Sequence, residues 1–263
     1  MRNMDLTETF EKTITDGEVE RWRYPRFFTE NIGKTAVITG DDAKHISTVL
    51  RMKSGDKAIV CDGKGTDCLC RIITAEKEFV ELEILDRQPN KAEPTVNLRL
   101  FQCMPKSDKM EFIVQKATEL GAAEVIPVLS KRCVSRPDKK SADKKTQRYQ
   151  KIADEASKQC GRGKIPHVAE LTTFEEAVKS VDKSHLGIIF YECGGKTLKE
   201  LTDGYDGRDI DVFIGCEGGF EPEEIRLAMK HGICPASLGE RILRCETAPV
   251  AAIAVLMNLT GNL

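Results

Sequence analysis

Two loops near the carboxyl end of the chain combine glycines with charged residues in a pattern that can build a working pocket. The first loop, Gly215–Gly219, carries Glu217. Its glycines let the backbone approach a ligand closely or adopt positive φ. The second loop, Leu238–Ala248, carries Arg244 and Glu246. A cation and a carboxylate together can stabilise an anion, orient a group or move a proton. The two loops therefore predict an enzyme pocket.

The first loop is not built for phosphate. The phosphate-cradling pattern G-x-x-x-x-G-K-[ST] and the dinucleotide pattern G-x-G-x-x-G are both missing from it. Glu217 is followed by three more acids before Ile225, which disfavours a pyrophosphate and favours a positively charged ligand. Pro222 suits the first turn of a helix, so the segment predicts strand, loop and helix. By itself, such a glycine turn is also a common structural arrangement.

The second loop precedes an apolar helix. Thr247 is the predicted N-cap and Pro249 falls in the first turn. Val250–Leu259 is apolar nearly all round, so this helix must be buried in a core or against a second subunit. Charges beside buried surface are costly without a partner or a task. The alternative to a functional role is a structural ion pair between Arg244 and Glu246.

Charge is unevenly distributed along the 263 residues. The segment from Lys131 to Lys164 holds twelve Lys and Arg and four Asp and Glu, a local net charge of +8, whereas the whole chain has −2. The remainder is therefore close to −10. A basic segment on an acidic background predicts a polyanionic partner such as RNA. A solvated lysine-rich loop is the alternative.

The remaining composition excludes several other classes of protein. The ten cysteines form no C-x-x-C pair and follow no apolar leader, and the four histidines are scattered. We therefore expect a reducing, cytoplasmic location and no metal site. The longest apolar run, Ala248–Met257, is too short to cross a bilayer.

The elements that must position these loops divide the chain into two regions. Residues 1–20 form an N-terminal extension without a convincing period. Residues 21–88 are strand-rich and predict a small β-barrel, followed by a linker at 89–94. The expected barrel elements are a helix at Asp42–Leu50 and strands at Lys57–Cys61, Thr66–Thr74 and Phe79–Leu85.

Residues 95–263 alternate strands and helices, which predicts an α/β domain with a mainly parallel sheet. Asp108 and Glu111 form a plausible capping pair for a helix that Gly121 ends. The other expected helix is Lys144–Cys160, with its lysines outward. The expected strands are Val96–Gln102, Glu124–Leu129, Leu186–Tyr191 and Ile210–Ile214.

The chain resembles the SPOUT methyltransferases in both loops. More narrowly, it resembles the RsmE family, which methylates N3 of a uridine in 16S ribosomal RNA. The loops read Gly215-Cys-Glu-Gly-Gly-Phe and Leu238-Gly-Glu-Arg-Ile-Leu-Arg-Cys-Glu-Thr-Ala. The likeness spans residues 22–263 and includes Tyr24-Pro-Arg-Phe-Phe, His45 with Val49-Leu-Arg51, Lys106-Ser-Asp-Lys-Met-Glu, Gln115-Lys-Ala-Thr-Glu-Leu-Gly and Glu155-Ala-Ser-Lys-Gln-Cys-Gly-Arg162.

The resemblance implies a fold, a cofactor and a partner. It implies an N-terminal PUA-like RNA-binding barrel and a C-terminal α/β domain tied in a trefoil knot. It also implies S-adenosylmethionine as cofactor, ribosomal RNA of the small subunit as substrate, and a homodimer with the knot helices at its interface. The implied cofactor-binding residues are Gly215, Glu217, Gly218, Gly219, Leu238, Gly239, Ile242, Leu243, Arg244, Thr247 and Ala248.

The expected catalytic residues are Arg244, which would stabilise the uracil anion, and Glu246, which would orient it or act as base. The expected RNA contacts are Arg26, His45 and Arg51 in the barrel and Lys106, Arg132, Arg136 and Arg162 in the catalytic domain.

Two positions depart from the family pattern. Cys216 stands where the family loop has proline, and Glu221 stands where Ser or Thr precedes Pro222. Two alternatives stay open at this point. One is an RNA-binding or ribosome assembly factor without catalysis. The other is a SPOUT methyltransferase that acts on another RNA.

Overall fold

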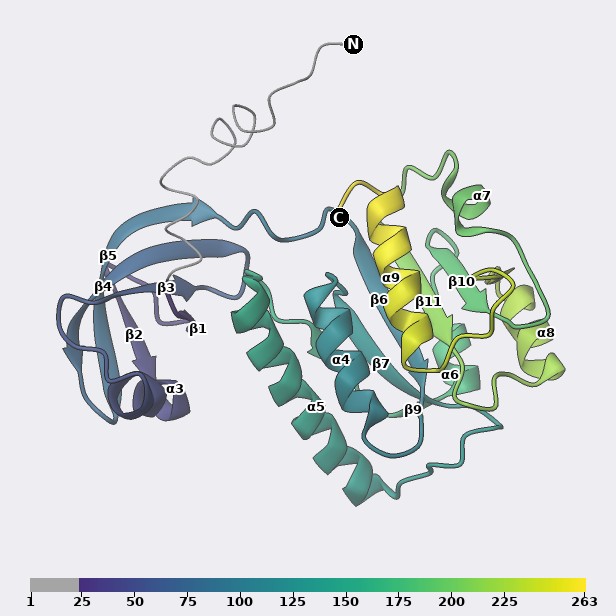
Figure 1. Ribbon diagram of the computed structural model, residues 1–263, viewed down its shortest axis with the longest axis horizontal. Helices are drawn as coiled ribbons and strands as arrows, with labels where there is room; N and C mark the ends of the chain where they lie inside the picture. Colours follow the sequence, from purple (N-terminus) through teal and green to yellow (C-terminus); the bar gives the residue numbers. More distant parts are fainter. Residues whose placement is uncertain (1–23) are drawn as a thin grey trace, which may run out of the picture. The chain divides into compact units, whose positions relative to one another are not determined.

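The computed structural model describes residues 24–263 (Figure 1). The predicted N-terminal extension, residues 1–20, lies outside the described residues. Two compact units emerge. One comprises the described chain up to Ala92 together with Lys158–Lys164, and the other comprises Glu93–Ser157 with Ile165–Leu263.

The first unit is a five-stranded sheet with the strand order β1-β3-β4-β5-β2. The buried residues of its strands pack into one core that includes Phe27, Ile38 and Leu82. The strands are β1 Arg26–Phe28, β2 Thr35–Thr39, β3 Lys57–Cys61, β4 Thr66–Ala75 and β5 Phe79–Pro89.

The predicted helix of this unit is two short pieces. Helix α3 spans Gly40–Lys44 and continues as a π-helix, η1, over His45–Val49. Arg51 then takes a positive φ of 53°, which is uncommon for a residue with a side chain.

Segment Lys158–Lys164 is bound into the first unit. The Asn90 side-chain amide donates to the Gly161 carbonyl oxygen (3.0 Å), and the Gly65 N–H donates to the Gly163 carbonyl oxygen (3.2 Å). Lys158 pairs with Asp42 at 2.8 Å. This unit therefore contains residues from two distant parts of the sequence.

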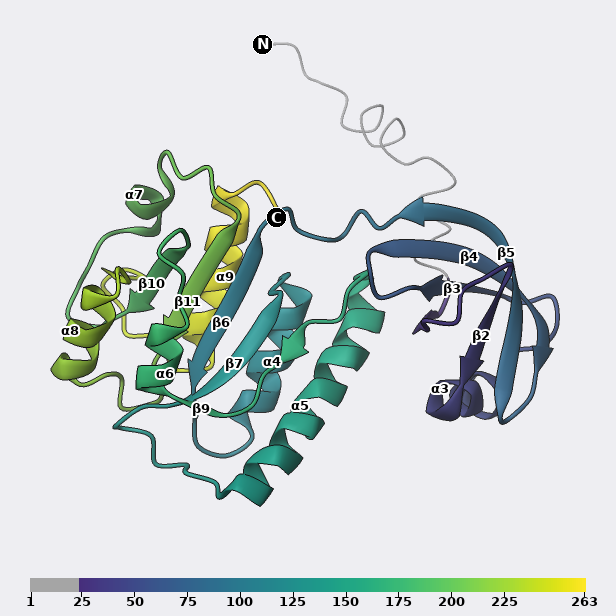
Figure 2. The ribbon, with the colours of Figure 1, turned by 180° about the vertical axis from the view of Figure 1, so that it is seen from behind.

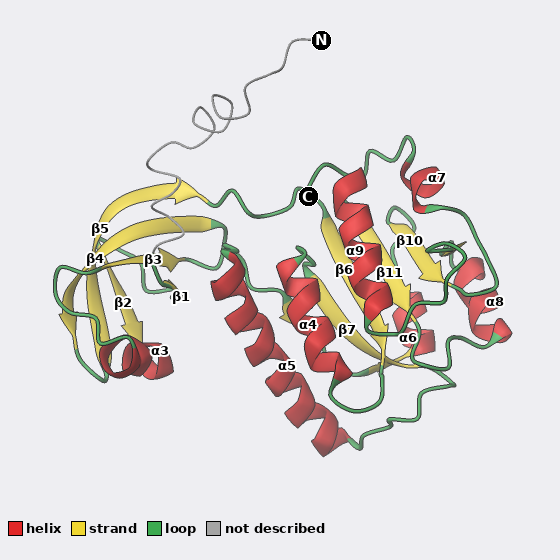
Figure 3. Cartoon of the chain, viewed as in Figure 1, coloured by secondary structure: helices red, strands yellow, loops and turns green. Residues whose placement is uncertain are grey.

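The second unit has a parallel sheet in the order β12-β10-β11-β6-β7-β8, with β9 also paired to β7 (Figure 3). Its strands are β6 Asn97–Cys103, β7 Glu124–Leu129, β8 His167–Val168, β9 Thr172–Thr173, β10 Leu186–Phe190, β11 Asp209–Ile214 and β12 Cys234–Ala236. Its helices are α4 Lys109–Glu119, α5 Lys139–Cys160, α6 Phe174–Lys179, α7 Leu198–Thr202, α8 Pro222–Lys230 and α9 Thr247–Leu259.

Helices cover both faces of this sheet (Figures 1 and 2). On one face, Leu100 and Val212 pack in a core with residues of α4, α5, α7 and α9. On the other face, Phe101 and Phe213 stack at 4.3 Å and pack with α6 and α8. Successive strand residues thus enter opposite cores, as parallel strands buried on both sides require.

Two predicted helix starts and one predicted capping bond need correction. Asp108 is the N-cap of α4, but its side chain makes no capping hydrogen bond. Helix α5 begins at Lys139 rather than Lys144, because the Asp138 carboxylate accepts the Ser141 N–H at 2.8 Å and caps an earlier turn. Helix α9 begins at Thr247, so its N-cap is Glu246.

Gly121 ends α4 as predicted, with φ of 94°. A Cβ at this position would come within 2.6 Å of Pro94 Cγ, so only glycine fits. Among residues 24–263, no helix is long and apolar enough to cross a membrane.

Candidate functional site

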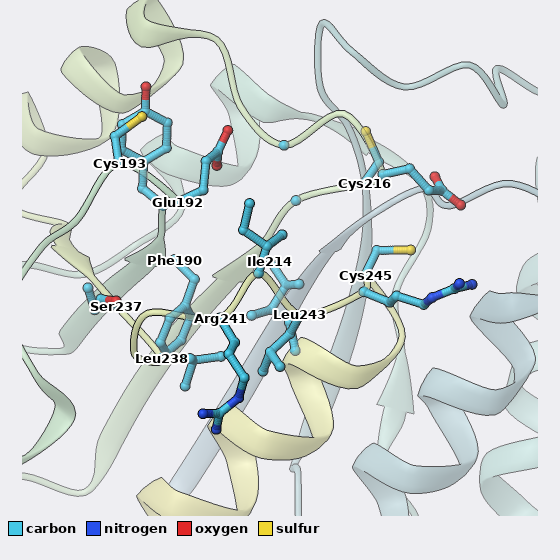
Figure 4. A pocket seen from close by; sticks show the side chains of 18 of the residues that line it. Phe190, Glu192, Cys193, Ile214, Cys216, Ser237, Leu238, Arg241, Leu243 and Cys245 are labelled. Atoms are coloured by element: carbon cyan, nitrogen blue, oxygen red, sulfur yellow. The ribbon is translucent and has the colours of Figure 1, made fainter.

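A pocket of about 720 Å³ lies at the carboxyl ends of β10, β11 and β12 (Figure 4). Three loops build it: the one after β10, the glycine loop after β11, and the segment between β12 and α9. Ligands of open parallel sheets bind at this edge, because the connecting loops converge there.

The structure brings the predicted cofactor residues together in this pocket. Thr247 is the exception, because it does not line the pocket. The predicted residues that line it are Gly215, Glu217, Gly218, Gly219, Leu238, Gly239, Ile242, Leu243, Arg244 and Ala248.

The glycine loop after β11 is a tight turn. The Gly219 N–H donates to the Cys216 carbonyl oxygen at 2.9 Å, and Gly219 has φ of 67°. A Cβ at Gly215 would lie 3.0 Å from the Gly219 Cα. Phe220, only 1% exposed, anchors the end of the turn in the core. The glycines are therefore required by the backbone path itself.

The start of α8 is held by Glu224. Its carboxylate accepts the Glu221 N–H (2.9 Å) and the Lys131 N–H (2.8 Å). The Glu221 carboxylate instead accepts from Arg132 Nε at 2.9 Å. Glu221 thus supports the loop through an ion pair.

Lys109, which the sequence reasoning did not select, connects the two loops. Its Nζ lies 3.1 Å from Glu217 Oε1 in the glycine loop and 3.0 Å from Glu246 Oε2 before α9. The Lys106 N–H also donates to Glu217 Oε1 at 3.1 Å. The segment that begins α4 therefore joins both loops by charge.

These contacts set the protonation of the three groups. Lys109 donates hydrogen bonds to the carboxylates of Glu246 and Glu217, and these bonds raise the pKa of Lys109. Partial burial alone would raise the pKa of Glu246, but the bond from Lys109 and its own backbone lower it. Glu217 behaves in the same way: burial is outweighed by backbone N–H groups and Lys109, so its pKa is lowered. Both carboxylates are ionised at neutral pH.

Arg244 does not form the ion pair that the sequence left open. Glu246 is bound by Lys109 instead, and the side chain of Arg244 has no ion-pair partner in the described part of the chain. Its carbonyl oxygen accepts the N–H groups of Thr247 and Ala248, each at 2.9 Å. Backbone bonds thus fix Arg244 beside the pocket, and its guanidinium stays exposed.

Cys216 occupies a sulfur cluster beneath the glycine loop. It packs in one core with Cys103 and Cys133, and all three are buried. Cys133 Sγ also lies 3.2 Å from Ser130 Oγ. A hydrogen bond with Cys133, together with burial, raises the pKa of Cys216, so this thiol is protonated. The residue in place of the family proline therefore faces the core.

The loop after β10 was missed from the sequence. Phe190, Tyr191, Glu192, Cys193 and Gly194 line the pocket. In Figure 4, Glu192 and Cys193 lie opposite Cys216 and Cys245. The predicted strand at Leu186–Tyr191 was the available signal, because its carboxyl end lies beside that of β11.

Two predicted RNA contacts in the first unit are turned inward. The Arg26 side chain is 8% exposed and pairs with Asp67 at 2.7 Å. Arg162, which was expected in the catalytic domain, belongs to the first unit and is 4% exposed. In this structure neither guanidinium is presented to a partner. His45 and Arg51 remain partly or fully exposed, and the His45 ring meets Phe27 edge-on at 6.3 Å.

Of the predicted RNA contacts in the second unit, two bond to the protein's own loops and one is simply exposed. Arg132 donates to the Gly218 carbonyl oxygen at 2.6 Å and thus holds the glycine loop. Arg136 donates to the carbonyl oxygens of Ser130 (2.7 Å) and Cys133 (3.2 Å). Lys106 is exposed. Both arginines therefore hold loops in place.

Residues 24–263 contain no group of three or more His, Cys, Asp or Glu that could hold a metal ion.

Comparison with known proteins gives two family matches. A profile described as "RNA methyltransferase domain" matches residues 91–257, and one described as "RNA methyltransferase PUA domain" matches residues 38–85. The chain is 32% identical over 233 residues to ribosomal RNA small subunit methyltransferase E of Bacillus subtilis, which covers 86% of this chain and 91% of that protein. The protein of the same name from Buchnera aphidicola (strain APS) is 27% identical, covering 95% and 99%.

Solved structures give the same result. Ribosomal RNA small subunit methyltransferase E from Neisseria gonorrhoeae, bound to S-adenosyl methionine, superimposes with a TM-score of 0.83 at 31% identity, covering 90% of this chain and 98% of that one. A methyltransferase from Legionella pneumophila in complex with the same cofactor has a TM-score of 0.80 at 31% identity, again covering 90% and 98%.

Proposed function

Because the chain belongs to the ribosomal RNA small subunit methyltransferase E family, we propose that it methylates N3 of a uridine in 16S ribosomal RNA with S-adenosylmethionine. The observation that carries the proposal is the pocket at the carboxyl ends of β10, β11 and β12, built from both predicted loops. The related structures that hold S-adenosylmethionine support the cofactor.

The pocket fits such a cofactor. Its volume of about 720 Å³ lies within the usual range of roughly 300–1,000 Å³ for small-molecule sites. Phe190, Ile214 and Leu243 offer apolar surface, and the glycine loop offers backbone groups. Glu192 adds negative charge toward a cationic ligand. When bound, S-adenosylmethionine supplies an electrophilic methyl group on a sulfonium.

Arg244 is the proposed catalytic residue. Uracil N3 is a weak nucleophile until it loses its proton, and the resulting anion spreads onto the flanking carbonyl oxygens. Arg244 lines the pocket and keeps an exposed guanidinium. A cation fixed at that position stabilises the anion as it forms.

Glu246 has the orienting role in this proposal. Its carboxylate is bound by Lys109 at 3.0 Å and its pKa is lowered, which makes it a weak base for uridine. Together with Glu217 it holds Lys109 between the two loops, so the loops keep their spacing around the cofactor.

RNA presentation belongs to the first unit in this proposal, through His45 and Arg51. The matched PUA domain, residues 38–85, includes both residues. The positive φ of Arg51 supports a functional role, because such backbone strain is common at binding sites. We also propose the domain limits 21–88 for the PUA-like domain, 89–94 for the linker and 95–263 for the methyltransferase domain. The proposed site of action is the cytoplasm, where ribosomal RNA is found.

A trefoil knot and a homodimer complete the proposed architecture. Strand β12 is at the sheet edge, whereas α9 contacts α4, α7 and β6. The segment between them therefore passes the loops after β10 and β11, which supports the proposed knot. Helix α9 also exposes Val255 and Leu259, 42% and 40%, on the side away from its core. These two residues lie one turn apart and so form a continuous apolar patch, the kind of surface that supports an interface. Sedimentation of the purified protein tests the dimer.

The decisive experiment is transfer of labelled methyl groups from S-adenosylmethionine to small subunits and to naked 16S RNA, with mass mapping of the modified base. N3-methyluridine is the expected product. Cofactor binding without transfer would indicate a binding protein, and another modified base would refute the assignment.

A further inference from the structure

The outward face of helix α5 carries a stripe of lysines, defined here as Lys140, Lys144 and Lys151. Their spacings of four and seven residues place them within about 40° of one another around a helix of 3.6 residues per turn. All three are exposed, and Gln147 is exposed between them. The stripe is about 16 Å long at 1.5 Å per residue.

The stripe lysines have no ion-pair partner among residues 24–263. Other surface lysines do: Lys116 pairs with Glu119, and Lys179 with Glu175. Lys158, next along the same face of α5, is engaged by Asp42. The nearby acids are Asp143, Asp154 and Glu155. Asp154 accepts a hydrogen bond from Gln150, and Glu155 also has a partner.

Helix α5 is a rigid support for these charges. Tyr149, Ala153 and Ala156, on its opposite face, are at most 5% exposed. Tyr149 and Ala153 belong to the core of the second unit. The backbone under the stripe is therefore fixed, and a partner meets a preformed row of cations.

Charge complementarity identifies the partner as RNA backbone. Arg26 and Arg162 are buried, and Arg132 and Arg136 hold loops of the protein itself. These four expected phosphate contacts thus already bond within the protein, although Arg132 and Arg136 remain exposed, whereas the stripe lysines have no ion-pair partner among residues 24–263. Lysine is a point donor that contacts phosphate without reading sequence.

We propose that the lysine stripe of α5 is a docking surface for the phosphate backbone of the RNA substrate. This inference rests on the proposed function, because it assigns a second contact region to the same substrate. The stripe supplies affinity and orientation, whereas the pocket selects the base. At about 3.4 Å per nucleotide along a strand, it spans roughly five phosphates.

The test replaces the stripe with glutamine, as Lys140→Gln, Lys144→Gln and Lys151→Gln together. The matched control replaces Lys183, Lys199 and Lys230, which are exposed lysines of the same unit. Both variants lose three charges and keep helix propensity, since Lys and Gln are similar. Equal thermal midpoints and equal S-adenosylmethionine affinities check that both are folded.

The measurement is the affinity for a 20-nucleotide single-stranded uridine RNA and for small subunits, between 50 and 200 mM salt. Loss of three phosphate contacts makes the negative slope of log K against log salt shallower by about 2. The unmodified protein therefore loses about 20-fold more affinity over this range than the stripe variant does. The control variant should keep the slope of the unmodified protein.

Equal slopes for the stripe and control variants would overturn the inference. An unchanged slope on RNA with weaker binding to subunits would also overturn it, and would indicate a protein partner. If the unmodified protein methylates RNA but the slopes are equal, only this inference fails. If the slope changes as expected but no methyl group is transferred, the proposed function fails and the stripe stands.

Discussion

Replacing Gly219 with alanine tests whether the backbone of the glycine loop forms the cofactor site. Gly219 has φ of 67°, and a Cβ there would lie 2.9 Å from Glu192 Oε1 and 3.0 Å from Oε2. The left-handed backbone costs a residue with Cβ about 1–2 kcal/mol. A less flexible unfolded chain offsets about 0.4–1 kcal/mol of this cost.

Gly232→Ala is the matched control. Gly232 has φ of 84°, but a Cβ there meets nothing within 4 Å. Both variants should therefore lose about 1 kcal/mol of unfolding free energy. Only Gly219→Ala displaces a carboxylate that lines the pocket, because Glu192 must move away from the new methyl group.

We expect Gly219→Ala to weaken S-adenosylmethionine binding at least about tenfold, equivalent to about 1.4 kcal/mol, and Gly232→Ala to leave it unchanged. Urea unfolding measures the stability of both variants, and titration calorimetry measures their affinity. If both variants bind the cofactor like the unmodified protein, while both lose stability, the glycine loop does not contact the cofactor.

Three further predictions concern single charged side chains. Arg244→Ala should slow methyl transfer by roughly 10²–10³-fold at saturating cofactor, with the dissociation constant of S-adenosylmethionine unchanged by calorimetry. Lys109→Met should weaken cofactor binding about tenfold, because Glu217 and Glu246 lose a shared charge-assisted donor; Lys109→Arg should restore most of it. Asp67→Asn should make the unfolding free energy less dependent on pH between about pH 4 and pH 2. Burial raises the pKa of Asp67, but hydrogen bonds from Arg26 and Asn90 prevail and hold it at about 2. The carboxylate therefore contributes on the order of 2 kcal/mol above pH 4, which is lost as the pH falls toward 2.

Each of these predictions has a contradicting outcome. Normal turnover in Arg244→Ala would remove the electrostatic role of that residue. If Lys109→Arg bound the cofactor as weakly as Lys109→Met, loss of the positive charge would not explain the weaker binding. Urea unfolding at pH 5 and pH 2.5 gives the loss of unfolding free energy on acidification. If this loss were the same for Asp67→Asn and for the unmodified protein, the pair with Arg26 would not be an acid-sensitive contact.

Local patterns predicted the elements that carry the pocket. Strands Lys57–Cys61 and Glu124–Leu129 agree at both ends with β3 and β7, because each is a short apolar run whose limits are marked by the neighbouring residues. The glycine loop was found for the same reason, since strand, turn and helix start are consecutive in sequence.

Contacts distant in sequence were not predictable in this way. Lys109 meets Glu217 and Glu246 only because α4 begins beside the carboxyl ends of the strands. Arg26 was expected to face RNA, but its partner Asp67 follows it by 41 residues and becomes its neighbour only once β1 and β4 flank β3. Burial of a charged residue depends on such a partner, which periodicity does not reveal.

The inclusion of Lys158–Lys164 in the first unit has a consequence for synthesis of the chain. Arg26 and Asn90 are translated early, yet the carbonyl groups that they contact, at Arg162 and Gly161, follow much later. At about 5–20 residues per second, the first unit waits roughly 3–15 seconds for its last segment. In a nascent chain that ends at Ala92, these donors would keep Asp67 but would lack the two later carbonyl groups. The first unit should therefore mature only after α5 has left the ribosome, and a fragment that ends at Ala92 should fold poorly.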